Sequence, residues 1–274
     1  MPFSSVVSST ASSTADGAFS FSAWDEQYND RHFDALYNEM MQVAGSGSSS
    51  SNPLTESPEF WWRLARVTSA LAGNIDATVD LSGKREKVIE AKEWAEKALR
   101  RSRDRSFEGH LWAAVATGDL MLLTASPAAR LPYLKVFADH LRQCKQADTD
   151  HWRVLLMEAN LQLNLYYTHP QAALLLRQAS KDQQPPPRID RLQLTVIAAK
   201  LRRSLELAPQ HLHTAFSLFL TLTKMNKYGE AVQVAAAGLS PERRQAHTLV
   251  DEQQMAALLE RWMHQLLGTT SEAH

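Results

Sequence analysis

The stretch from Leu205 to Gly238 constrains the fold of this chain more than any other stretch. It predicts the end of one helix, a second helix, a tight turn at residues 228–231 and a third helix. Pro209 stands between the first two helices, and Ala231 lies 22 residues further on. A helix pair of this kind cannot bury its apolar face alone, so neighbouring pairs must stack on it.

This spacing resembles the tetratricopeptide (TPR) repeat of about 34 residues, in which a proline closes one repeat and a small residue lets the helices of the next approach. Ala215 and Phe219 stand where the repeat usually has tryptophan and glycine, so the repeat is degenerate. The rest of the chain can be divided into similar helices, and it lacks a convincing alternating strand pattern. We therefore predict an all-α fold, a TPR-like right-handed helical solenoid of antiparallel helix pairs.

Composition narrows the class of protein. The chain has 274 residues, 44% of them hydrophobic, and a formal net charge of −1, which suits a soluble globular protein and argues against a nucleic-acid binder. Its single cysteine, Cys144, excludes an intrachain disulfide and favours a reducing compartment. We find neither a signal peptide nor an apolar run of the roughly 18–20 residues that span a bilayer. We expect a cytoplasmic protein with no transmembrane segment.

The domain organisation follows from composition shifts and helical periodicity. We expect a disordered Ser/Thr-rich tail over residues 1–23, a short amphipathic helix over 24–44, a flexible linker over 45–57, a TPR-like domain over 58–268 with a loop insertion at 181–188, and a frayed tail over 269–274. The short helix either caps the first repeat or binds a partner. The triple-proline insertion is either a loop or an SH3-type ligand.

Aromatic and basic residues provide the first candidate site. Adjacent residues on a helix point about 100° apart, so only one of Trp61 and Trp62 can pack inward, and the other covers a second neighbour or lines a groove. Arg63 and Arg66 on the same helix would border that groove, since aromatic residues and arginines dominate binding in such sites. The candidate groove aromatics are Trp61, Trp62, Trp112 and Trp152.

One concentration of positive charge provides the second candidate. It consists of Lys97, Arg100, Arg101, Arg103 and Arg105. Together with Arg63 and Arg66, these are the candidate partner- or phosphate-binding residues. They could meet an acidic surface, such as the glutamate-rich tails of tubulin, or a lipid phosphate. The alternative is an ordinary solvated helix end, where basic residues are favoured.

Three segments resemble the regulator of microtubule dynamics family. They are SPEFWWRLARVTSAL, EAKEWAEKALRRS and HLWAAVATGDL, and they match the family's pattern at Trp62 to Ala65, at Ala98-Leu99, and at His110 with Trp112. With two later helix pairs, the resemblance covers roughly residues 57–240. Trp61, Ala113 and the triple-proline insertion depart from the pattern.

The resemblance implies association with microtubules and a role at the spindle. For some animal members it also implies tethering at membrane contacts, with phospholipid held in the concave TPR surface. The main hypothesis is therefore a non-catalytic scaffold that binds tubulin, microtubules or a microtubule-associated partner. The alternatives are a phospholipid-binding or lipid-transfer module at membrane contact sites and a generic peptide-binding TPR adaptor.

No residue pattern favours catalysis, a metal or a cofactor. His211 and His213 are two residues apart on a helix and diverge, so they cannot share a metal as an i, i+4 pair can. Cys144 has Lys145 beside it but no recognisable histidine partner. Phosphate-loop, dinucleotide-binding and nucleophile-elbow motifs are missing from the sequence. We therefore predict that the protein is not an enzyme.

Overall fold

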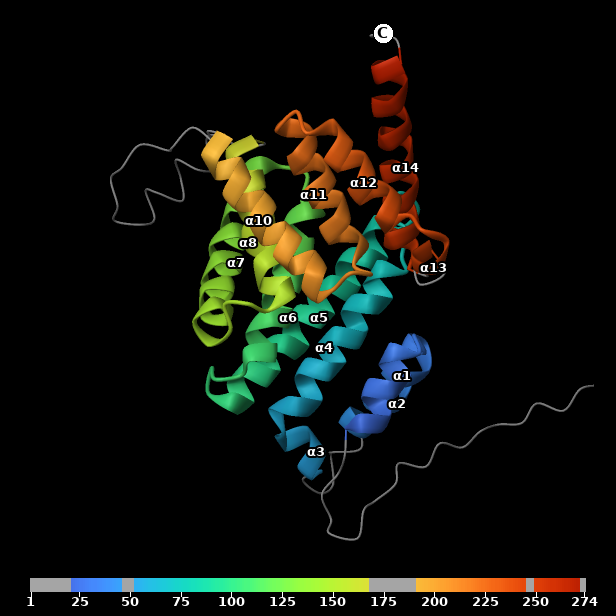
Figure 1. Ribbon diagram of the computed structural model, residues 1–274. Coiled ribbons are helices and arrows are strands. Elements are labelled where there is room, and N and C mark those ends of the chain that lie inside the picture. Colours follow the sequence, from blue (N-terminus) through green and yellow to red (C-terminus); the bar gives the residue numbers. More distant parts are fainter. Residues whose placement is uncertain (1–20, 46–51, 168–190, 245–248, 272–274) are drawn as a thin grey trace, which may run out of the picture.

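The computed structural model describes residues 21–45, 52–167, 191–244 and 249–271 (Figure 1). Helices and connecting loops account for these four segments, which contain no strand. Consecutive helices pack side by side in pairs, and the pairs stack on one another (Figure 1). The all-α, TPR-like helical solenoid predicted from the sequence is confirmed.

Four helix pairs build the stack. They are α4 (Pro58–Gly73) with α5 (Leu81–Ser102), α6 (Phe107–Leu122) with α7 (Pro127–Ala147), α8 (Trp152–Tyr167) with α10 (Arg191–Leu207), and α11 (Leu212–Lys224) with α12 (Tyr228–Gly238). In the third pair, Ser204 Oγ near the end of α10 donates a hydrogen bond to the carbonyl of Trp152 at the start of α8 (2.8 Å), so the two helices run antiparallel. The predicted insertion at 181–188 lies outside the described residues.

Local signals in the sequence determine where α4 and α6 begin. Ser57 Oγ accepts a hydrogen bond from Glu59 N (3.2 Å) before α4, and Ser106 Oγ accepts one from Gly109 N (3.0 Å) before α6. Such caps satisfy backbone donors that would otherwise have no partner. A Cβ at Gly109 would lie 2.9 Å from Leu99 Cδ2, so glycine here lets α6 pack closely against α5.

The amino-terminal helix expected over residues 24–44 is two helices, α1 (Ser22–Asn29) and α2 (Phe33–Gly45). The break falls at Arg31, whose positive φ of 63° is incompatible with a continuous right-handed helix. Both helices lie along α4 (Figure 1). A short helix, α3 (Pro53–Glu56), occupies part of the segment expected to be a flexible linker.

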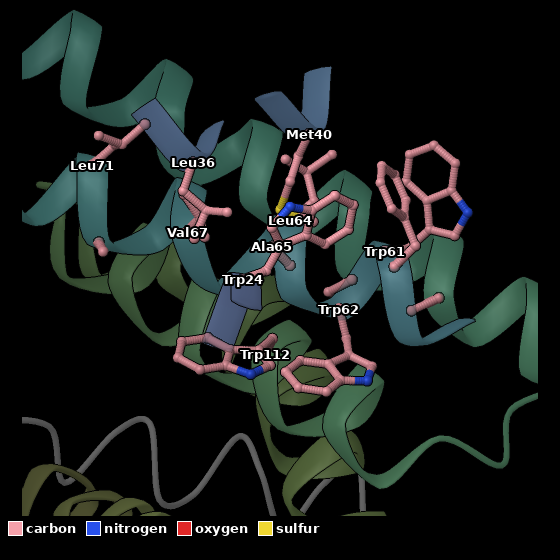
Figure 2. Close-up of a cluster of buried hydrophobic side chains, with 14 of the residues drawn as sticks. Trp24, Leu36, Met40, Trp61, Trp62, Leu64, Ala65, Val67, Leu71 and Trp112 are labelled. Carbon is pink, nitrogen blue, oxygen red and sulfur yellow. The ribbon is translucent and has the colours of Figure 1, made fainter. Parts of the chain in front are cut away.

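The N-terminal core joins α1 and α2 to the first repeat. Trp24, Leu36 and Met40 share one buried cluster with Leu64 of α4 (Figure 2). The ring centroid of Trp24 also lies 5.7 Å from that of the buried Phe60. Burying a large apolar side chain contributes about 1.5–3 kcal/mol relative to leaving it exposed. The two helices therefore cover the apolar end of the stack, as a terminal repeat requires.

The carboxy-terminal end returns to the first repeat. After α13 (Pro241–Arg244), α14 (Val250–Ser271) packs on α11 and α12. At its start, Asp251 accepts a hydrogen bond from Lys84 Nζ of α5 (2.7 Å), and Glu252 pairs with Arg31 (2.9 Å). The two ends of the described chain are thus joined by ion pairs. Among the helices placed in the structure, none is long and apolar enough to cross a membrane.

Candidate binding surfaces

The basic residues at the end of α5 form one exposed surface, which we call the basic cluster. Its members are Lys97, Arg100, Arg101, Arg103 and Arg105. The four arginines are exposed, whereas Lys97 is half-buried with its Nζ 3.4 Å from the centroid of the Trp61 ring. Burial, followed by the charges of Arg101 and Arg100, lowers the pKa of Lys97. The cluster is therefore a region of mutually repelling positive charge.

Most of this charge is available to a partner. Arg101 forms an ion pair with Glu56, and both side chains are exposed. Arg100, Arg103 and Arg105 form no ion pair with any residue that the structure describes. Surface ion pairs contribute only about 0–1 kcal/mol, so the pairing of Arg101 is easily exchanged.

The loop that carries Arg103 and Arg105 has a defined conformation. Arg103 and Asp104 both have positive φ, 54° and 58°. The amide of Asp104 donates to the carbonyl of Leu99 (2.9 Å), and Nε2 of His110 donates to the carbonyl of Asp104 (3.1 Å). Arg103 and Arg105 are therefore presented from a turn anchored at both ends, and Arg100 and Arg101 from the last turn of α5.

The second surface is the inner face of the stack, formed by α4, α6, α8, α11 and the start of α14. Charged side chains from separate helices act on one another there, because Arg153 of α8 influences Glu108 and Asp119 of α6 as well as His213 of α11. Glu108, Trp112 and Asp119 share one face of α6, at spacings of four and seven residues. These elements thus converge on one charged region.

Arg63 and Arg66 lie at the edge of the inner face and are paired. Arg63 binds the carboxylate of Asp25 through Nη2 (2.8 Å) and Nε (3.1 Å), and Arg66 pairs with the same carboxylate. Burial alone would raise the pKa of Asp25, but the hydrogen bonds and charges of Arg63 and Arg66 outweigh it and lower that pKa. The structure therefore places helix α1 over the two arginines that were predicted to border an open groove.

Three of the four predicted groove aromatics are buried. Trp61, Trp62 and Trp112 are only 2%, 7% and 4% exposed, and Figure 2 shows the rings of Trp61 and Trp62 leaving α4 in different directions. The first stacks on Trp94 of α5, with ring centroids 5.3 Å apart. The ring of Trp62 lies beneath the guanidinium of Arg63, 4.1 Å from its centroid. Both rings serve packing between helices, and Trp152 alone of the four stays partly exposed.

Sequence reasoning missed Arg153, which lies partly buried in this charged region. Its guanidinium stands over the rings of Trp112 (4.7 Å) and Trp152 (4.4 Å) and has no ion pair within the described segments. Burial lowers its pKa, yet arginine remains protonated. In the same region, Trp112 Nε1 and Arg66 Nε are buried donors without an acceptor among the described residues. The only sequence signal for Arg153 is the adjacent Trp152.

A carboxyl group in the same region has an unusual affinity for protons. Burial, followed by the charge of Asp251, raises the pKa of Asp119 from 3.8 to about 7, against the opposing effect of Lys84 and Arg153. The inner face therefore changes its charge near neutral pH. The described residues contain no group of three or more side chains able to hold a metal ion.

Stacked antiparallel helix pairs with converging inner helices define a TPR-like scaffold. A solved thermophilic TPR protein of Thermus thermophilus has the same architecture, with a TM-score of 0.51 over 87% of this chain and 96% of that one. At 15% identity, this likeness shows the fold alone. The profile of the family described as regulator of microtubule dynamics protein 1-3 matches residues 21–157, half of the chain. The chain belongs to this family. No curated protein sequence matches it.

Proposed function

We propose that this protein is a non-catalytic scaffold that binds tubulin or microtubules, or a microtubule-associated partner, through the basic cluster. The observation that carries the proposal is the exposed set of Arg100, Arg103 and Arg105, which has no internal ion pairs within the described residues. Membership in a family of microtubule regulators supplies the class of partner. We place this activity in the cytoplasm, on microtubules or at the spindle.

The chemistry of the cluster favours an acidic protein surface. Arginine presents a planar fork of donors that matches carboxylates, and several arginines together attract a glutamate-rich segment over about 10 Å at moderate salt. Because the whole chain is close to neutral, the attraction is local to the basic cluster rather than a property of the net charge of the chain. Binding should therefore weaken steeply as salt is added.

The cluster can be tested by charge reversal. We expect Arg100→Glu, Arg101→Glu and Arg103→Glu together to weaken binding about tenfold or more at low salt, since several attractive contacts become repulsive. Cosedimentation of the full chain with microtubules over a range of salt concentrations measures the change. The matched control is Lys135→Glu, Arg142→Glu and Lys145→Glu on α7, which makes the same charge change at other exposed positions. Equal pelleting of the two triple variants would show that the basic cluster is not part of the binding site.

The inner face supports a second candidate function, phospholipid binding or transfer. The supporting observation is the group formed by Arg153, Arg66 Nε and Trp112 Nε1, a half-buried positive charge in the same region as two buried donors that lack acceptors among the described residues. Buried polar groups usually have partners, and a phosphate would provide acceptors for all three. Apolar side chains of Phe216, Leu220 and Met255 lie partly buried further along the stack, where acyl chains could pack.

The second candidate predicts lipid bound to the purified protein. Native mass spectrometry should detect copurified phospholipid, or uptake from liposomes that contain an anionic phospholipid. Arg153→Gln should reduce the bound fraction about fivefold or more, because the positive charge opposite the phosphate is removed. Arg202→Gln on α10, where the arginine pairs with Glu230, should leave the fraction unchanged. Absence of lipid from the unmodified protein in both experiments would exclude this function.

A further inference from the structure

Ser106 stands directly beside the basic cluster, at the junction between the α5–α6 loop and helix α6. Arg103 and Arg101 precede it by three and five residues, and Arg105 comes immediately before it. Arginines at these spacings are what the acidic substrate grooves of arginine-directed serine/threonine kinases recognise, because their charge patterns are complementary. Arg103 and Arg105 are exposed and have no ion pair among the described residues, so a kinase can reach them.

We propose that Ser106 is a phosphorylation site for an arginine-directed serine/threonine kinase and that the phosphate switches off the basic cluster. The switch rests on the function proposed above, in which this cluster binds an acidic partner. The modification site itself rests on the loop and its sequence alone.

The local geometry accommodates a phosphate. Ser106 is partly exposed, and its Oγ accepts a hydrogen bond from Gly109 N (3.0 Å) at the start of the 16-residue helix α6. A phosphate attached to this oxygen lies at the positive end of the helix dipole, where negative charge is favoured. Its three oxygens can also accept hydrogen bonds from Arg103 and Arg105.

A neighbouring serine provides an internal comparison. Ser102 Oγ donates to the carbonyl of Leu99 (3.1 Å) and accepts from Ser106 N (3.1 Å). The residue three positions before it is the buried Leu99 rather than an arginine. Ser102 therefore lacks the recognition spacing, although it lies in the same part of the chain.

The reaction needs ATP as co-substrate. The Ser106 Oγ attacks the γ-phosphorus, the Oγ–P bond forms, and the bond from that phosphorus to the β–γ bridging oxygen breaks. ADP leaves, and the hydroxyl proton passes to the catalytic base of the kinase. The product carries about −1.5 to −2 additional charge at pH 7.

That charge acts on the cluster in two ways. It offsets about two of the five positive charges, and it engages Arg103 and Arg105, which would otherwise face the partner. Both effects reduce attraction to an acidic surface. The effect should disappear at high salt, where the attraction between exposed charges is screened.

The test uses the full chain with Mg-ATP and the catalytic subunit of cyclic-AMP-dependent protein kinase as probe. Peptide mass spectrometry should place one phosphate on Ser106. We expect Ser106→Ala to lose this phosphate and Ser102→Ala to keep it. Microtubule cosedimentation of the phosphorylated protein should then show about fivefold weaker binding at low salt than that of the unphosphorylated protein.

The outcomes separate this inference from the proposed function. Absence of phosphate from Ser106 overturns the modification site. Unchanged pelleting of phosphorylated protein, alongside weakened pelleting of the triple charge-reversal variant, overturns the switch and leaves the proposed function standing. If neither change affects pelleting, the proposed function and the switch both fail, while a phosphate found on Ser106 still establishes the modification site.

Discussion

Replacing Trp61 with alanine should lower the free energy of unfolding by about 3–5 kcal/mol, the usual cost of removing a buried tryptophan. The ring is buried between Phe60 and Trp94, with centroid distances of 4.7 and 5.3 Å. Its Nε1 donates to the carbonyl of Thr55 (2.7 Å), so the substitution also leaves an acceptor without its donor. Urea denaturation followed by circular dichroism measures the change.

A graded pair of variants makes the Trp61 result interpretable. Trp61→Phe keeps an aromatic ring against Trp94 and loses the hydrogen bond to Thr55, so we expect it to be destabilised by about 1–2 kcal/mol. Trp61→Phe also provides a measurement of the contribution of this side chain if the alanine variant does not fold. A loss below about 1 kcal/mol for Trp61→Ala, with an unchanged m-value, would contradict the packing described for this helix.

Much of the helical framework could be predicted because its signals are local. Ala231 is fully buried, as a small residue at a close helix approach should be. The turn expected at residues 228–231 falls three residues earlier, at 225–227, where Asn226 has a positive φ of 61°, and residues 228–231 form the first turn of α12. Pro127 opens α7, at the first helical position that suits proline. Helical period and capping chemistry act within a few residues, so a single sequence displays them directly.

Two positions could not be predicted from local signals. Glycine is more typical of a loop than of a helix, but Gly83 lies within the first turn of α5, which begins at Leu81. Its amide donates to Asp80 Oδ1 (2.8 Å), and a Cβ there would lie 2.1 Å from Asp80 Oδ2. The glycine makes room for a cap rather than a turn. Arg31 gave no sign of its left-handed backbone, because such a conformation is uncommon outside glycine.

The two candidate sites also differ in how much of each could be predicted from local sequence. The basic cluster is contiguous in sequence, so its charge is visible without a structure. By contrast, Arg153 and Asp119 lie on different helices, and each appears ordinary in its own segment. Their relationship depends on which helix of each pair faces inward and how the pairs stack, which the periodicity of one helix does not specify.

Asp119→Asn should stabilise the protein at alkaline pH. It should also remove much of the pH dependence of the free energy of unfolding near neutrality. The pKa of Asp119 is raised from 3.8 to about 7, so between these values the folded protein holds a proton that the unfolded chain has released. Stability therefore falls as pH rises between these two values. Above pH 7 the folded protein bears the full free-energy cost of the ionised Asp119 carboxylate. Because solvent partly reaches the side chain, we expect Asp119→Asn to raise the free energy of unfolding at alkaline pH by about 1–3 kcal/mol.

Comparing the two proteins at pH 4 and pH 8 isolates this carboxyl group. At pH 4 the carboxyl of Asp119 is protonated when folded, so the unmodified protein and Asp119→Asn should unfold at similar urea concentrations. At pH 8 the variant should resist more urea, since asparagine carries no charge beside Asp251. The lowered pKa values of His140 and His213 affect both proteins alike and cancel in the difference. An equal difference at both pH values would mean that the carboxyl titrates normally and that the inner face keeps a constant charge near neutrality.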